Sequence, residues 1–248
     1  MNLLRFVAGF AAMTLGVLPL PAATADTENA EAAECVILLH GLARTSAAME
    51  EMQEALTDEG YFVVNDSYPS REYPIEELAP MAIDPALEKC QQAGNGERVS
   101  FVTHSLGGIL VRYYMQHNEL DVMGRVVMLG PPNQGSSAAD SMRNIPGFEL
   151  LNGPAGSQLG KGEDSVPLSL GVPEFEFAVI AGNRTIDPVT SLMLPNPDDG
   201  KVSVADTRLE GMADFALVTV SHAYIMKDEE VIELVKQFLR DGRFEPAP

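Results

Sequence analysis

Residues 99–117 read VSFVTHSLGGILVRYYMQH, and this stretch decides the fold. The apolar run Val99–Thr103 predicts a buried strand, and Leu106–His117 predicts a helix that follows it almost at once. Only a sharp turn can join two such elements. A turn of this kind would lift the hydroxyl of Ser105 above the edge of a sheet.

The residues around Ser105 match a known strand-turn-helix motif in part. In the G-x-S-x-G nucleophile elbow, small residues flank the serine because larger ones do not fit around the corner. The second glycine of the motif is present as Gly107, whereas Thr103 replaces the first. The strand before and the helix after the turn strengthen the interpretation. We therefore predict that Ser105 is a nucleophile.

Strand-like and helix-like segments alternate on both sides of this stretch. Continuous apolar runs predict strands at Cys35–Leu39, Tyr61–Val64, Val99–Thr103, Val126–Leu129, Phe175–Ala181 and Phe215–Val220. Helical spacing predicts helices at Thr45–Thr57, Pro74–Cys90, Leu106–His117 and Asp228–Arg240, the second broken near Pro80 or Pro85. This alternation predicts an α/β fold, with a mostly parallel sheet of about six strands and helices on both faces. Ligands of such sheets bind beyond the carboxyl ends of the strands.

The end of the first predicted strand offers backbone donors for a developing negative charge. An oxyanion needs two N–H groups that point at one spot. Leu106 follows the nucleophile at a helix N-terminus and offers one of them. The sequence His40-Gly41-Leu42 lets the backbone turn inward, and we expect Leu42 to offer the other. An ordinary turn is the alternative for His-Gly.

A base and an acid follow in the chain order Ser, Asp, His that this arrangement requires. Of the four histidines, only His222 lies in a late loop, after a predicted strand and before the last helix. It is the candidate base. The loop after Phe175–Ala181 is the natural source of the acid. We favour Asp199, which precedes a glycine, and keep Asp198 and Asp187 as alternatives.

The N-terminal residues have the features of an export signal. Arg5 precedes the apolar run Phe6–Leu20, and Ala23-Thr24-Ala25 forms a small-residue cleavage site. The run is shorter than the roughly 20 residues of a spanning helix, although an uncleaved anchor is the alternative. We predict a signal peptide at 1–25, a flexible leader at 26–34 and a periplasmic or secreted domain at 35–248. No stable membrane span would remain after cleavage.

The chain contains two cysteines, Cys35 and Cys90, and in an exported protein such a pair can form a disulfide. Two independent buried thiols are the alternative. Two isolated cysteines without nearby histidines do not make a metal site, so we expect none.

The charge of the chain excludes some partners. The formal net charge is −20, and removal of residues 1–25, which contain Arg5 but no acidic residue, would make it −21. Such a surface repels the phosphates of nucleic acids and disfavours anionic lipid. Solubility or a salty habitat explains it best, and the sequence says nothing about the oligomeric state.

Five segments together carry a resemblance to a known group of proteins. These are HGLARTSAAMEEM, THSLGG, GPPNQGS and PDDGKVSV with SHAYIM, which extend the similarity from about Cys35 to Phe244. In these segments the chain resembles the bacterial lipase and esterase branch of the α/β-hydrolase superfamily. In that family the Asp-Gly-x-Val-Ser turn carries the triad acid, which favours Asp199. The residue after His-Gly supplies an oxyanion N–H, which favours Leu42.

The resemblance implies an enzyme that hydrolyses carboxylic esters of small molecules or lipids without a cofactor. Some bacterial lipases hold a structural calcium ion, to which Asp198 could contribute, but no oxygen-rich loop is evident here. The same triad also serves thioesterases, amidases and transacylases. A catalytically silent, hydrolase-like binding protein is a further alternative.

Residues 131–173 interrupt the alternating pattern, with many Gly and Pro residues and no clear period. The segment should leave the sheet beside the predicted site and return to it. We expect it to form a small cap or lid, with an acyl pocket lined by Phe148, Leu150, Leu151 and Leu159. A surface excursion packed on the core is the alternative.

Overall fold

A six-stranded sheet forms the centre of the structure, a computed structural model that describes residues 33–142 and 147–245. The strands are β1 (Cys35–Leu39), β2 (Phe62–Asn65), β3 (Val99–His104), β4 (Met123–Leu129), β5 (Phe177–Gly182) and β6 (Asp214–Val218). All neighbours pair in parallel, in the order β2-β1-β3-β4-β5-β6. The predicted parallel α/β architecture is therefore confirmed. The predicted signal peptide 1–25 and most of the leader 26–34 lie outside the described residues.

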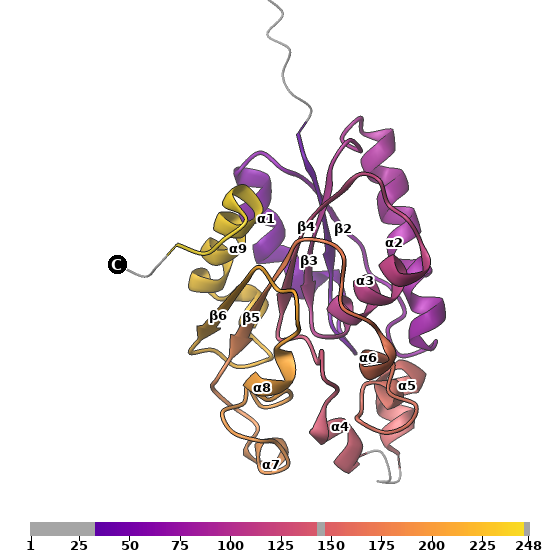
Figure 1. Ribbon diagram of the computed structural model, residues 1–248, viewed down its shortest axis with the longest axis vertical. Coiled ribbons are helices and arrows are strands. Elements are labelled where there is room, and N and C mark those ends of the chain that lie inside the picture. The colour runs from indigo at the N-terminus through magenta and orange to yellow at the C-terminus, as the bar shows by residue number, and fades with distance from the viewer. Residues whose placement is uncertain (1–32, 143–146, 246–248) are drawn as a thin grey trace, which may run out of the picture. The chain divides into compact units, whose positions relative to one another are not determined.

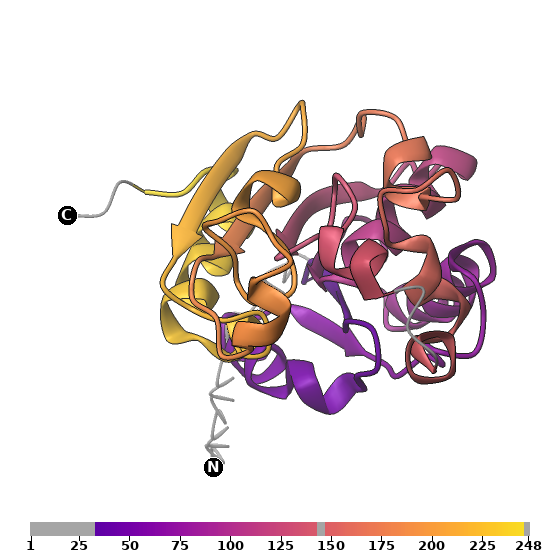
Figure 2. The ribbon, with the colours of Figure 1, turned by 90° about the horizontal axis from the view of Figure 1, so that it is seen from below.

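Helices cover both faces of the sheet (Figures 1 and 2). The helices that pack on its faces are α1 (Glu50–Asp58), α2 (Ile75–Gln92), α3 (Leu106–His117) and α9 (Glu229–Asp241). The helices α2 and α3 pack on one face and share a buried cluster with alternate strand residues such as Ile37 and Phe101. The helices α1 and α9 pack on the other face, where Leu38 and Val102 belong to a second cluster. Because both faces are covered, the central strands are apolar along their whole length.

The predicted break in α2 is wrong, because the helix continues through Pro80 and Pro85. Each proline removes the N–H that would bond to the carbonyl four residues earlier, in these cases that of Glu76 or Met81. Both of those residues are exposed, so water can satisfy the carbonyls. The opposite side of α2, which includes Leu78 and Ile83, is buried against the core. Packing therefore outweighs the local cost of the prolines.

Strand boundaries differ from the predictions by a few residues at some ends. The strand β4 begins at Met123, three residues earlier than the apolar run Val126–Leu129 suggested. Gly124 and Arg125 break the run, but the backbone pairs through them with an irregularity opposite Val99 and Phe101. Backbone pairing thus extends beyond the hydrophobic pattern.

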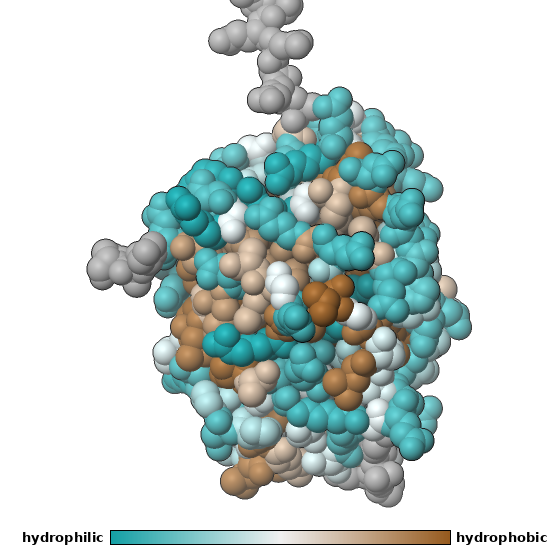
Figure 3. Space-filling model, viewed as in Figure 1, coloured by the Kyte–Doolittle hydropathy of each residue, from teal (hydrophilic) through white to brown (hydrophobic). Residues whose placement is uncertain are grey.

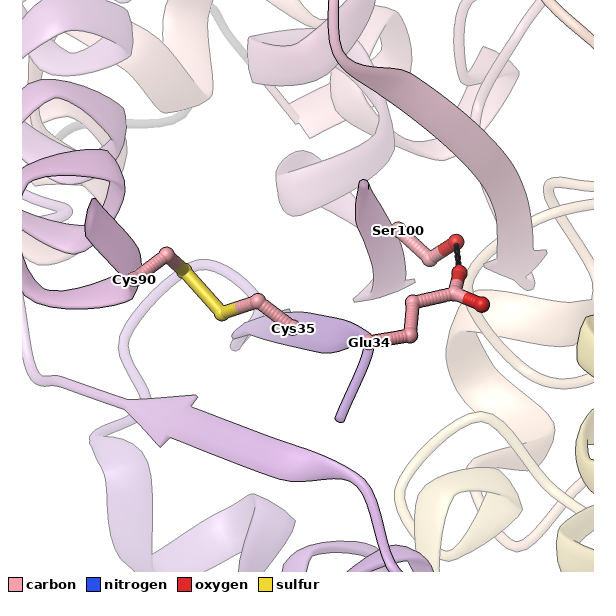
Figure 4. Close-up of a disulfide and its surroundings, with 4 residues drawn as sticks. All are labelled: Glu34, Cys35, Cys90 and Ser100. Atoms are coloured by element: carbon pink, nitrogen blue, oxygen red, sulfur yellow. Dashed lines mark hydrogen bonds between the residues drawn. A yellow bond between two sulfur atoms is a disulfide. The ribbon is translucent and has the colours of Figure 1, made fainter. Parts of the chain in front are cut away.

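A disulfide links the start of β1 to the end of α2 (Figure 4). The sulfur atoms of Cys35 and Cys90 are bonded, and their Cα atoms lie 5.8 Å apart. Beside it, the hydroxyl of Ser100 in β3 donates a hydrogen bond to the carboxylate of Glu34. These contacts hold the end of the sheet opposite the carboxyl ends of the strands.

Short helices connect the last strands and lie at the carboxyl end of the sheet (Figure 1). Between β4 and β5 are α4 (Ser137–Met142), α5 (Phe148–Gln158) and α6 (Val166–Ser169), which fill much of the segment 131–173. Between β5 and β6 are α7 (Pro188–Ser191) and α8 (Val204–Thr207). The 3-10 helices η1 (Ser46–Met49) and η2 (Ile225–Lys227) precede α1 and α9.

The visible surface is largely hydrophilic, as Figure 3 shows for the face seen in Figure 1. This agrees with the strongly acidic composition of the chain. Within the described residues, no helix is both long enough and apolar enough to cross a membrane.

Candidate active site

Ser105 forms the corner between β3 and α3 in a strained backbone conformation. Its φ of 52° and ψ of −115° lie outside the regions that residues with a side chain usually adopt. The N–H of Ser105 donates to the carbonyl of Leu129, 2.9 Å away, which ties the corner to β4. Strain of this kind persists only where the surrounding structure enforces it, and it is concentrated at functional sites. The predicted sharp turn is therefore present.

Close packing around the turn at Ser105 explains where the nucleophile-elbow motif needs small residues. A Cβ atom on Gly107 would lie 2.6 Å from the carbonyl oxygen of Leu39, so no larger residue fits there. Thr103 occupies the place of the first motif glycine and is fully buried. Its hydroxyl lies against Gly108, where an added Cβ would be only 3.2 Å away. The missing side chain of Gly108 thus makes room for the threonine.

Partly buried His222 and buried Asp199 form a pair at the carboxyl end of the sheet. The Nδ1 atom of His222 lies 2.7 Å from Oδ2 of Asp199. The other carboxylate oxygen accepts hydrogen bonds from the backbone N–H groups of Lys201 and Val202, at 2.9 and 2.8 Å. The N–H of His222 also donates to the carbonyl of Asp199, at 3.0 Å. The carboxylate is therefore fixed on one side by its own turn and holds the imidazole on the other.

The two alternative acids have different partners. Asp198 accepts hydrogen bonds from the Ser191 hydroxyl and from the N–H of Gly200, both at 2.7 Å. Asp187 caps α7 and lies 2.9 Å from the ammonium group of Lys201. Hydrogen bonds from Thr190 and Lys201 hold the pKa of Asp187 below its ordinary range. Of the three carboxylates, only Asp199 contacts His222.

A segment at the end of β4 brings the serine and the His–Asp pair to the same place. Leu129 accepts the hydrogen bond from Ser105, and the next residue, Gly130, lies against the pair. A Cβ atom on Gly130 would be 3.1 Å from both Asp199 Oδ2 and His222 Nδ1. Among the residues that the structure describes, no hydrogen bond joins the Ser105 hydroxyl to the His222 ring. Such bonds are often long in free enzymes and tighten when substrate binds.

The two predicted oxyanion donors have unused backbone N–H groups. Among the hydrogen bonds of the described residues, none uses the N–H of Leu42 or of Leu106. Leu106 is the first residue of α3, where the helix dipole favours negative charge. Both groups are therefore available to an external acceptor.

His40 fixes the orientation of the peptide that carries the Leu42 N–H. The Nδ1 atom of His40 lies 2.9 Å from the carbonyl oxygen of Gly41, and Nε2 accepts from the N–H of Tyr68, at 3.2 Å. The rings of His40 and Tyr68 stack with their centroids 4.0 Å apart. In a trans peptide the C=O and N–H bonds point in opposite directions. Because His40 holds the Gly41 carbonyl on one side, the Leu42 N–H is directed to the other side.

Burial keeps two histidines of the site neutral. Desolvation lowers the pKa of His40, and desolvation together with the neighbouring His222 lowers the pKa of His104 well below its ordinary value. Burial also raises the pKa of the Tyr68 hydroxyl, which donates to the carbonyl of His40. In the sequence, His40 belongs to the His-Gly turn and His104 directly precedes the nucleophile, but no pattern gives them a role, and no local motif marks Tyr68.

The residues predicted to line an acyl pocket differ in their exposure. Leu159 is buried in the main core cluster, whereas Leu150 and Leu151 are 87% and 65% exposed. The side chain of Phe148 lies outside the described part of the structure. A kink at Gly153 turns the second half of α5 toward the core, which separates these leucines.

The segment 131–173 contacts the start of α2 and the loop that carries Asp199. The Gln158 amide accepts from the N–H of Ile75, at 2.8 Å. The Ser136 hydroxyl donates to the carbonyl of Lys201, two residues from Asp199. Among the described residues, no group of three or more His, Cys, Asp or Glu side chains could hold a metal ion.

Comparisons with solved structures identify the class to which this architecture belongs. The mature form of lipase BlEst2 from Bacillus licheniformis superposes with a TM-score of 0.65 at 20% identity, covering 84% of this chain and 93% of that chain. Phospholipase PlaB from Legionella pneumophila has a TM-score of 0.65 at 18% identity, over 84% of this chain and 59% of that chain. An extracellular α/β-hydrolase from a Paenibacillus species has a TM-score of 0.51 at 15% identity, over 84% and 100%. The chain has the α/β-hydrolase fold.

The first part of the chain also matches a sequence family. Residues 29–129 match the family described as "Putative serine esterase (DUF676)". No curated protein matches the sequence significantly. The resemblance to bacterial lipases and esterases of the α/β-hydrolase superfamily is confirmed by these findings. The match over residues 29–129 supports a hydrolase of the serine esterase kind, while the structural likeness, at such low identity, shows the fold alone.

Proposed function

We propose that this protein is a serine hydrolase that cleaves carboxylic esters through Ser105, His222 and Asp199. The observation that carries the proposal is the 2.7 Å contact between the His222 ring and the Asp199 carboxylate, next to the strained corner at Ser105. The three residues come from separate loops at one end of the sheet. Their chain order, Ser, Asp, His, is that of α/β-hydrolase triads.

In the proposed first step, the hydroxyl oxygen of Ser105 attacks the ester carbonyl carbon. The Nε2 atom of His222 accepts the hydroxyl proton, and Asp199 stabilises the resulting imidazolium through Nδ1. The carbonyl electron pair moves to oxygen, which the N–H groups of Leu42 and Leu106 bind. The tetrahedral intermediate then collapses, and His222 protonates the departing alcohol. The acyl group remains on Ser105.

In the second step, water hydrolyses the acyl-enzyme. His222 takes a proton from the water as its oxygen attacks the acyl carbon. The second tetrahedral intermediate expels the serine oxygen, which regains its proton from His222, and a carboxylic acid is released. No cofactor takes part in this scheme.

The replacement Ser105→Ala tests the proposal directly. We expect the variant to lose several orders of magnitude in kcat on p-nitrophenyl esters, because the nucleophile is gone. It should also fail to react with a fluorophosphonate probe, whereas the native protein is labelled at Ser105. Ser141→Ala, which changes an exposed serine, is the matched control. Near-normal turnover by Ser105→Ala would contradict the assignment.

Thioester or amide cleavage and acyl transfer remain alternatives on the same triad. Assays with matched ester, thioester and amide substrates, with and without an added alcohol acceptor, distinguish them. Failure of the phosphonate probe to react would instead favour a silent binding protein. We favour ester hydrolysis because the family match is to serine esterases.

We further propose that residues 131–173 form a cap with an anchored base beside the site. Leu159, Val166 and Leu170 belong to the main core cluster, so much of the segment is part of the folded core. The exposed Leu150 and Leu151 at the start of α5 are available to contact apolar substrate.

Export is part of the proposal. The signal-like residues 1–25 and the disulfide between Cys35 and Cys90 both fit an oxidising compartment, either the periplasm or the medium. The acidic surface favours uncharged or cationic substrates over anionic lipid surfaces.

A further inference from the structure

We propose that His104 is a positioning residue that ties the base, His222, to the strand that carries the nucleophile. The inference rests on the proposed function. His104 is the last residue of β3, directly before Ser105, and is 2% exposed. Its ring centroid lies 4.8 Å from that of His222.

The contact between the two histidines defines the tautomer of His104. Its Nε2 atom lies 3.0 Å from the backbone carbonyl oxygen of His222. A carbonyl oxygen only accepts hydrogen bonds, so Nε2 carries the hydrogen and donates it. The Nδ1 atom is buried without a hydrogen-bond partner among the described residues. This arrangement suits a neutral ring with one donor.

Among the described residues, three hydrogen bonds hold His222, and one of them leads to the strand that carries the nucleophile. The ring Nδ1 and the backbone N–H of His222 both bond to Asp199. These two bonds leave His222 free to move together with the Asp199 turn. The third bond, from His104 to the His222 carbonyl, connects the base to β3 and hence to Ser105. Without it, the base would be placed relative to the nucleophile by the Asp199 turn and by the packing of Gly130 against the His–Asp pair.

The neutral state of His104 fits this role. Its burial, together with the nearby His222 ring, keeps the pKa of His104 well below its ordinary value. The ring therefore stays uncharged when His222 accepts the proton from Ser105. A second positive charge at this distance would oppose that transfer.

The experiment compares His104→Phe, which keeps a ring but removes the donor, with His104→Gln, which keeps an N–H donor. We expect His104→Phe to lower kcat by about 10²-fold with little change in KM, because a small displacement of a reacting group costs about that much. His104→Gln should restore most of the loss. His117→Phe, at an exposed histidine of α3, is the matched control and should retain native kinetics.

A proton NMR measurement separates positioning from a general loss of structure. The low-field resonance of the His222 Nδ1–H, which reports its bond to Asp199, should broaden in His104→Phe and stay sharp in His104→Gln. Native kcat in His104→Phe, or a loss that glutamine does not restore, would overturn the inference. If His104→Phe does not fold, nitrogen NMR of the native protein tests the proposal instead. The proposal requires the ring hydrogen of His104 to be on Nε2. A hydrogen on Nδ1 would overturn it. Ser105→Ala tests the proposed function separately.

Discussion

At the scale of single residues, the site depends on side chains that hold backbone groups as much as on the proposed triad. His40 orients the peptide of Leu42, and His104 bonds to the carbonyl of His222. Both rings are neutral because burial disfavours their charged forms. Neutral buried histidines have a consequence for stability as well as for catalysis.

We expect the free energy of unfolding to fall as the pH decreases below about 6.5. The folded-state pKa of His104 is lowered, so the unfolded chain binds a proton that the folded protein does not. The contribution of neutral His104 to the free energy of unfolding is therefore fully present above the ordinary histidine pKa. It is lost as the pH falls toward the lower pKa that His104 has in the folded protein. The loss due to this one residue grows as the pH falls from the ordinary histidine pKa toward the lowered one. Urea unfolding at pH 7 and pH 5 measures it.

The variant His104→Gln provides the control for this pH effect. It should show a smaller loss of stability between pH 7 and pH 5, with the remainder due to other groups such as His40. An equal loss in the variant and the native protein would show that His104 does not contribute.

Residue-level sequence patterns predicted the positions of Ser105 and His222, because each lies next to a clear strand and helix. The glycine after Asp199 favours this residue as the acid, but the sequence leaves Asp198 and Asp187 open as alternatives, since all three lie in one loop. The direction of each carboxylate depends on the turn around Gly200, where the backbone donors of Lys201 and Val202 hold Asp199.

At the scale of elements, the connection between β4 and β5 was the hardest part to predict. Its helices are short, and α5 and α6 contain proline, so no helical period is visible in the sequence. The kink at Gly153 buries Ala155 and Leu159 while Leu150 remains exposed. The predicted pocket grouped leucines that this kink separates.

The anchored cap has a kinetic consequence. Because Leu159, Val166 and Leu170 are in the core, we expect no opening of the whole segment at a lipid surface. The rate with a sparingly soluble ester should rise smoothly through its solubility limit. A sharp increase in rate at that limit would instead indicate a mobile lid.

The disulfide is a second element-level feature with a measurable effect. Cys35 and Cys90 are 55 residues apart, and a link of that span stabilises by about 2–4 kcal/mol, mainly through the unfolded chain. Urea unfolding with and without reductant should show a loss of this size. The double variant Cys35→Ala/Cys90→Ala should be insensitive to reductant, and an equal midpoint for reduced and oxidised native protein would contradict the expectation.

At the scale of the described domain, a covered parallel sheet carries the site at one end. The alternating pattern along the chain was enough to predict this architecture, because strands buried on both faces are uniformly apolar. It could not predict the strand order or the way in which His40, Tyr68 and His104 brace the site, since these contacts join residues far apart in the sequence.

Because β6 lies at the border of the sheet, we expect it to unfold before the central strands on denaturation. This strand pairs with one neighbour, its residues Asp214–Leu217 are partly or fully exposed, and the chain leads from it to His222. Border strands open at lower cost than central ones. Hydrolytic activity should therefore vanish at a urea concentration where far-UV circular dichroism still reports most of the native secondary structure. Coincidence of the two midpoints would mean that the border strand and the centre melt as one unit.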